Sequence, residues 1–88
     1  MEATEKYSVD DVVEYLVFII HKFARTYHLT DPEAVDYLIR FKGTEFLREN
    51  YGCEHTQNPY WTVKDVLDVC RRNGGYPLPK KKELDYYE

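Results

Sequence analysis

The sequence predicts an all-α protein, a compact bundle of three to four helices with a long central first helix, a structured loop before the last helix and a mobile C-terminal tail. Apolar residues recur at helical spacing in several segments, helix-capping residues stand at their ends, and no segment gives a strong strand signal. A chain of 88 residues suffices for one small domain, predicted over residues 1–76, with a flexible tail over 77–88.

The first predicted helix runs from about Val9 to Tyr27 with Ser8 as its N-cap. Its apolar stripe repeats at i, i+3, i+4 and i+7, and consists of Val9, Val12, Val13, Leu16, Ile20, Phe23, Ala24 and Tyr27. The run from Tyr15 to Ile20, with Val17, Phe18 and Ile19, widens that stripe. The helix is therefore expected either to be central, with other helices on several sides, or to form an interface with a second copy.

Three shorter helices are predicted after it. One begins at the capping box Thr30–Glu33 and ends at Gly43. The next covers Thr44–Tyr51 and is too short to be stable without packing. The last is expected to begin with Thr62 as its N-cap and to end at residues 73–75, Asn-Gly-Gly, with YWTV as a short extended piece at its start.

The net charge of -4 and the pI of about 5.3 argue against a nucleic-acid partner, because such proteins need a basic surface. Nine tyrosines indicate either large side chains filling a thin core or contact surfaces for another protein. The N-terminus does not resemble a signal peptide, and the longest apolar run, Tyr15–Ile20, is too short to cross a bilayer. A cytoplasmic protein without membrane contact is predicted, with reduced thiols at Cys53 and Cys70, although their spacing leaves a disulfide open.

The segment NYGCEHTQNPYW, residues 50–61, concentrates the reactive side chains. A metal site would use Cys53, His55 and Cys70, with His28 or His21. Structural zinc sites normally supply paired ligands at close regular spacing, and the only close pair here is C-x-H. We therefore expect neither a metal nor a cofactor.

Catalysis by Cys53 would need a thiolate beside a base. In an extended segment Cys53 and His55 would share one face. Glu54 would raise the pKa of a nearby thiol, and a domain of this size offers little room for a substrate cleft. The sequence predicts no catalytic residue and no enzyme.

Two interpretations of the segment remain. It is either a turn whose side chains satisfy backbone groups, with Tyr60 and Trp61 holding it onto the core, or a recognition surface shown to a partner. The candidate structural or partner-binding residues are Asn50, Tyr51, His55, Thr56, Gln57, Tyr60 and Trp61.

The pattern N-Y-x-x-x-H-T-Q resembles a motif of a family of short bacterial proteins of unknown function. Its matching residues are Asn50, Tyr51, His55, Thr56 and Gln57, and Val63, Asp65 and Val66 continue the pattern. The resemblance covers about residues 9–74. Many members of that family are encoded beside ADP-ribosyltransferase-like toxins, which implies a genomic setting rather than a mechanism.

These observations predict a protein-binding module of unknown biochemical activity, antitoxin-like or an accessory partner of an ADP-ribosyltransferase-type toxin, with DYYE in the tail as a candidate binding strip. The first alternative is a homodimer formed through Tyr15–Ile20. The second is a small redox or cysteine-based enzyme using Cys53 and His55. A DNA-binding regulator would have to rely on Lys64, Arg71 and Arg72, which do not form a dense basic face.

Overall fold

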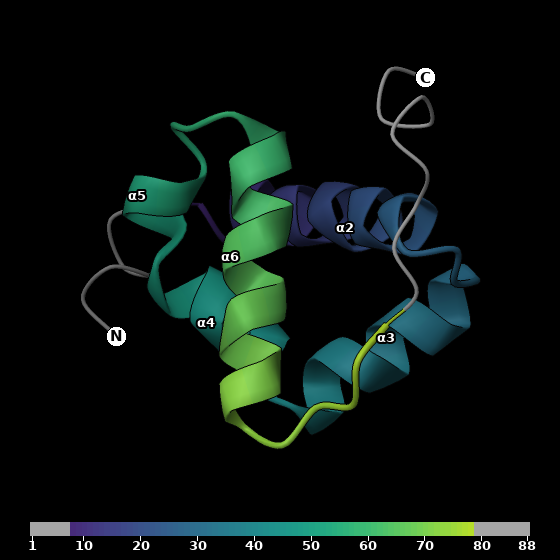
Figure 1. Ribbon diagram of the computed structural model, residues 1–88. Coiled ribbons are helices and arrows are strands. Elements are labelled where there is room, and N and C mark those ends of the chain that lie inside the picture. The colour runs from purple at the N-terminus through teal and green to yellow at the C-terminus, as the bar shows by residue number, and fades with distance from the viewer. Residues whose placement is uncertain (1–7, 79–88) are drawn as a thin grey trace.

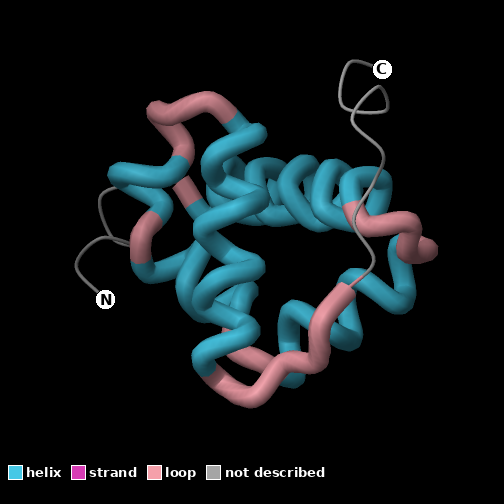
Figure 2. Tube along the Cα trace, in the orientation of Figure 1, coloured by secondary structure: helices cyan, strands magenta, loops and turns pink. Residues whose placement is uncertain are grey.

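The computed structural model describes residues 8–78, and over this range the protein is all-α, as predicted. The helices are α2 (Val9–Thr26), α3 (Asp31–Arg40), α4 (Gly43–Glu49), α5 (Tyr51–Glu54) and α6 (Pro59–Arg72). Figure 1 shows α2 crossing behind α6, with α3 and α4 below α2 and the short α5 beside the start of α6. Figure 2 shows the loops between them, and no strand occurs in residues 8–78.

The core lies where α3, α4 and α6 pack against α2, which confirms the long first helix as a central element. The largest fully buried apolar side chains are Ile19, Phe23, Tyr37, Leu38, Leu47, Val63 and Val66. Complete burial of a side chain such as Leu or Phe contributes about 1.5–3 kcal/mol. This packing explains why helices as short as α4 are formed at all.

The predicted stripe of α2 is only partly buried. Val12, Phe23 and Ala24 face the core, but Val9 is 66% exposed and Val13 is 50% exposed. Ile19, predicted only to widen the stripe, is completely buried. The other helices therefore cover only part of the apolar surface of α2. Within residues 8–78, the apolar residues Val9 and Val13 near its start stay exposed.

Local capping signals predict the starts of α2 and α3 correctly. The Ser8 hydroxyl accepts a hydrogen bond from the Asp10 N–H at 3.1 Å and caps α2. At α3 the capping box is complete, because the Thr30 hydroxyl accepts from the Glu33 N–H at 3.2 Å and the Glu33 carboxylate accepts from the Thr30 N–H at 2.8 Å.

The predicted ends around residues 42–54 are wrong. Gly43 does not end α3; Lys42 takes the left-handed conformation with φ 71°, and Gly43 is the buried first residue of α4. The helix predicted over Thr44–Tyr51 ends earlier, at Glu49, since the chain turns at Asn50 and becomes helical again as α5. The Asn50 side chain donates to the Phe46 carbonyl at 2.9 Å, and the same carbonyl accepts from the Asn50 N–H, so both groups hold the turn at the end of α4.

The start of α6 also differs from the prediction. Asn58 is the N-cap, accepting from the Tyr60 N–H at 2.8 Å, and Pro59 is the first helical residue. Asn followed by Pro is itself a helix-start signal, because Asn caps and Pro has no N–H to leave unsatisfied. Thr62 is therefore an interior residue, and YWTV is helical rather than extended.

After α6 the chain turns at Gly74, with φ 96°, and returns along α3 (Figure 2). The Tyr37 hydroxyl donates to the Tyr76 carbonyl at 2.7 Å, and Leu78 packs against the core. Residues 79–88, which hold most of the predicted tail and the DYYE strip, lie outside the described residues.

Several large apolar side chains stay exposed. On α2 they are Val9, Val13, Val17 and Phe18, and elsewhere Ile39, Trp61 and Tyr76. None of the helices within residues 8–78 combines the length and apolar character needed to cross a membrane. Exposed groups of apolar residues of this kind are candidates for contact with another protein.

Candidate functional site

The structure separates the seven candidate residues. Tyr51, His55 and Gln57 point inward around α5, whereas Tyr60 and Trp61 lie on the first turn of α6 with Trp61 exposed. Asn50 and Thr56 are exposed and bond to nearby backbone, the Thr56 hydroxyl donating to the Cys53 carbonyl at 2.8 Å. The segment is therefore not one continuous recognition surface.

An aromatic cluster joins α5 to α2. The rings of Tyr51 and His55 stack with centroids 4.1 Å apart and planes 5° apart, and Tyr15 presents its edge to Tyr51 at 5.2 Å. The His55 Nδ1–H donates to the Tyr51 carbonyl. Since a carbonyl only accepts, this bond places a proton on Nδ1. His55 thus fixes the end of α5 and the ring that packs on α2.

A polar network around Gln57 joins α5 to α6. Gln57 Nε2 donates to Glu54 Oε1 at 2.6 Å and to Asp65 Oδ2 at 3.1 Å. A longer contact of 3.3 Å joins the same nitrogen to Thr62 Oγ1. The completely buried Thr62 hydroxyl donates in turn to the Glu54 carbonyl at 3.2 Å. One amide therefore bonds two carboxylates on neighbouring helices, a charge-assisted arrangement stronger than neutral hydrogen bonds.

Two groups in this network have shifted pKa values. Burial raises the pKa of Glu54 above its ordinary 4.5, and the nearby Asp65 carboxylate raises it further. The hydrogen bonds from Gln57 and Thr62 lower this pKa, but they do not cancel the increase. Burial also raises the pKa of Tyr15. The Tyr15 hydroxyl lies near Thr62, but within residues 8–78 it makes no hydrogen bond of acceptable geometry.

The raised pKa of Glu54 predicts a pH effect on stability. A carboxyl whose pKa is higher in the folded state favours folding fully below its unfolded pKa of about 4.5, and this contribution is lost as pH rises through the folded pKa. We expect Glu54→Gln to remove that loss, so that at pH 7 the variant is as stable as the wild type or more stable. The new amide can still accept from Gln57 and can donate to Asp65.

Urea unfolding of both proteins between pH 4 and pH 8 measures this difference. Glu45→Gln, at an exposed position of α4, controls for the loss of one negative charge. A Glu54→Gln variant that loses stability relative to the wild type as pH rises would contradict the assignment.

The cysteines are free and placed apart, with Cys53 exposed and Cys70 buried in the core. Burial raises the pKa of Cys70 to about 11, so its thiol is an inert core group. The premise that Cys53 and His55 share a face of an extended segment is wrong, because Cys53 lies in α5. Within residues 8–78, no three His, Cys, Asp or Glu side chains gather as metal ligands would.

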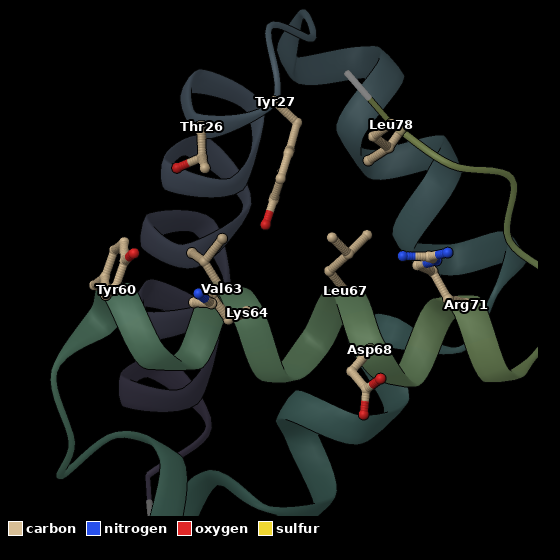
Figure 3. A pocket seen from close by; sticks show the side chains of 9 residues that line it. All are labelled: Thr26, Tyr27, Tyr60, Val63, Lys64, Leu67, Asp68, Arg71 and Leu78. Carbon is tan, nitrogen blue, oxygen red and sulfur yellow. The ribbon is translucent and has the colours of Figure 1, made fainter. Parts of the chain in front are cut away.

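A groove of about 330 Å³ lies between the end of α2, the outer side of α6 and the C-terminal segment (Figure 3). Lys64 lies at one end and Arg71 at the other, and the Tyr27 ring points toward α6 between Val63 and Leu67. The complete lining is Thr26, Tyr27, Tyr60, Val63, Lys64, Leu67, Asp68, Arg71 and Leu78. The lining mixes apolar side chains with two cations and the Asp68 carboxylate, which pairs with Arg72, and it suits a segment that carries both apolar and polar side chains.

An aromatic and cationic group borders this groove. Trp61 is 54% exposed and meets Tyr60 edge to face at 5.1 Å. The Lys64 ammonium lies 5.3 Å from the Tyr60 ring and 5.8 Å from the Trp61 ring. Tyr60 and Lys64 also line the groove, so the exposed indole extends it into one surface, hereafter the α6 surface (Tyr60, Trp61, Lys64 and the groove).

Comparison with known families shows that the profile of a family described as "Protein of unknown function (DUF3791)" matches residues 14–73. The chain belongs to the DUF3791 family. The match begins within α2 and ends at the C-cap of α6, so the DUF3791 region contains the Gln57 network and the α6 residues of the groove. Neither the curated proteins nor the solved structures include a match.

Sequence reasoning missed several residues of both sites. In the network these are Tyr15, Glu54 and Thr62, and in the groove they are Thr26, Tyr27, Leu67, Asp68, Arg71 and Leu78. The spacing of Lys64, Asp68 and Arg71 along one helix face was a usable signal for the groove. Nothing local signals that Tyr15 lies beside Thr62.

Proposed function

We propose that this DUF3791 protein is a protein-binding module without catalytic activity of its own, acting in the cytoplasm as an antitoxin-like or accessory partner of an ADP-ribosyltransferase-type enzyme. The α6 surface carries the proposal. An exposed tryptophan and a half-buried tyrosine border the groove, and these are residue types that dominate binding energy at protein interfaces. The choice of partner is supported by the resemblance of the N-Y-x-x-x-H-T-Q motif, which implies a genomic setting beside such enzymes.

The motif side chains point into the fold, so their role differs from that of the α6 surface. Tyr51 and Gln57 are engaged within the fold, so we propose that the motif holds α5 against α2 and α6. Trp61, by contrast, is 54% exposed, and its ring contacts Tyr60 and Lys64 on the same helix. The partner is expected to place an apolar contact on Trp61 and an acidic residue beside the Lys64 ammonium.

Trp61→Ala is expected to weaken binding to the co-encoded transferase at least about tenfold, since truncation of a central aromatic contact typically costs over 1.4 kcal/mol. Its thermal unfolding should stay close to that of the wild type, because the ring is mostly exposed. Co-purification followed by calorimetric titration measures the effect.

Ile39→Ser is the matched control, because Ile39 is also a largely exposed apolar residue, on α3. It should bind as the wild type does. Absence of any association with the co-encoded protein at micromolar concentration would overturn the proposed function, and equal loss in both variants would overturn the α6 surface.

A further inference from the structure

The face of α2 that points away from the core has an apolar middle and charged ends. Val17 and Phe18 are 60% and 49% exposed and stand at the middle of the helix. Acidic residues precede them and basic residues follow them on the same side of a helix with 3.6 residues per turn. This outer face of α2 consists of Asp10, Glu14, Val17, Phe18, His21 and Arg25, all exposed.

Most charged residues of this face have no ion-pair partner in the part of the chain that the structure describes. No acid–base pair spaced i, i+4 occurs along α2, and within residues 8–78 no ion pair engages Asp10, Glu14 or Arg25. His21 alone has a charged neighbour, Asp31 at 3.3 Å. The helix dipole favours acids at the N-terminus and bases at the C-terminus, but it gives no reason for the large apolar pair between them.

We propose that this face binds the same face of a second copy of the chain, with the two α2 helices antiparallel about a two-fold axis that passes between Val17 and Phe18. Asp10 and Arg25 lie at equal distances from that point, about 11 Å along the helix at 1.5 Å per residue. Antiparallel pairing therefore brings Asp10 of one copy level with Arg25 of the other, and Glu14 level with His21. Parallel pairing would bring like charges together.

Two-fold symmetry makes each of these contacts occur twice, with the Val17 and Phe18 side chains of both copies meeting at the axis. The outer face of α2 lies on the side away from the core, while α6 crosses the other side of α2 (Figure 1). The α6 surface stays accessible in the dimer. The inference therefore stands independently of the proposed partner.

Sedimentation velocity of the full chain, from about 10 μM to about 1 mM, tests the pairing at low and high salt. One helix pair is a small interface, so a reversible dimer with a dissociation constant on the order of 0.1 mM is expected. Added salt should weaken the dimer by screening the charged ends. Phe18→Ser should leave only monomer, whereas Ile39→Ser, which removes an exposed apolar residue from α3, should not change the dimer.

A charge exchange tests the antiparallel orientation. Asp10→Arg and Arg25→Asp should each weaken self-association roughly tenfold, because each turns two attractive contacts into repulsive ones. An equimolar mixture of the two variants should associate as strongly as the wild type, since opposite charges then meet again at both ends. Circular dichroism melts confirm that each variant is folded.

Three results would overturn the inference. These are a wild-type chain that stays monomeric at 1 mM, a dimer that persists in Phe18→Ser, and a mixture that associates no better than its components.

Discussion

Replacing Gln57 with alanine should lower the free energy of unfolding by about 2–3 kcal/mol, because a buried carboxylate then loses its nearest donor. Gln57 Nε2 is 2.6 Å from Glu54 Oε1, and the Glu54 side chain is almost completely buried. Without the amide, the Glu54 and Asp65 carboxylates also face each other with nothing between them. Urea unfolding at pH 7 measures the loss.

Thr56→Ala is the control for Gln57→Ala. Thr56 belongs to the same motif, but its hydroxyl donates only to the Cys53 carbonyl one turn away and is exposed. A loss within about 1 kcal/mol is expected for removing such a bond. If the two variants unfold at the same urea concentration, the network does not carry the stability assigned to it.

Gly43→Ala should destabilise the protein by about 1–3 kcal/mol, the cost of overpacking a filled core. Helix propensity alone predicts the opposite sign, since alanine is favoured over glycine in helices by about 1 kcal/mol. A Cβ at Gly43 would lie 2.7 Å from Leu38 Cδ2, 2.9 Å from Cys70 Sγ and 3.1 Å from Val66 Cγ2. The start of α4 can approach α3 and α6 this closely only without a side chain.

A double-mutant cycle with Cys70→Ala identifies the cause. Removing the Cys70 sulfur opens space near the new methyl group, so Gly43→Ala should cost less in that background, by about 1 kcal/mol. Thermal or urea unfolding of the four proteins provides the cycle. Stabilisation by Gly43→Ala in the wild-type background would show that propensity outweighs the close contacts.

The features that the sequence predicts well are local ones. The N-cap Ser8 and the capping box at Thr30 depend on residues within one turn, so their geometry follows from their identity. The all-α class follows from the helical periodicity in the same way. The start of α6 is also a local signal, at Asn58 and Pro59, which the prediction of Thr62 as the N-cap overlooks.

The features that the sequence does not predict depend on neighbours far along the chain. Gly43 reads locally as a helix end, and only the approach of Val66 and Cys70 from α6 shows that it is needed for space. Tyr15 and Thr62 belong to different helices that folding brings together. The residue types of the motif drew attention to it as a candidate site, while the inward direction of its side chains follows from packing.

Urea unfolding of the His55→Ala, Gln57→Ala double variant tests the central claim, that the motif holds the fold while the α6 surface meets the partner. We predict that the double variant lowers the free energy of unfolding by at least about 3 kcal/mol, which is a large share of the stability of a small domain. Trp61→Ala, measured in parallel, should change the free energy of unfolding by no more than about 0.5 kcal/mol. A double variant that unfolds at the wild-type urea concentration, while Trp61→Ala does not, would contradict the claim.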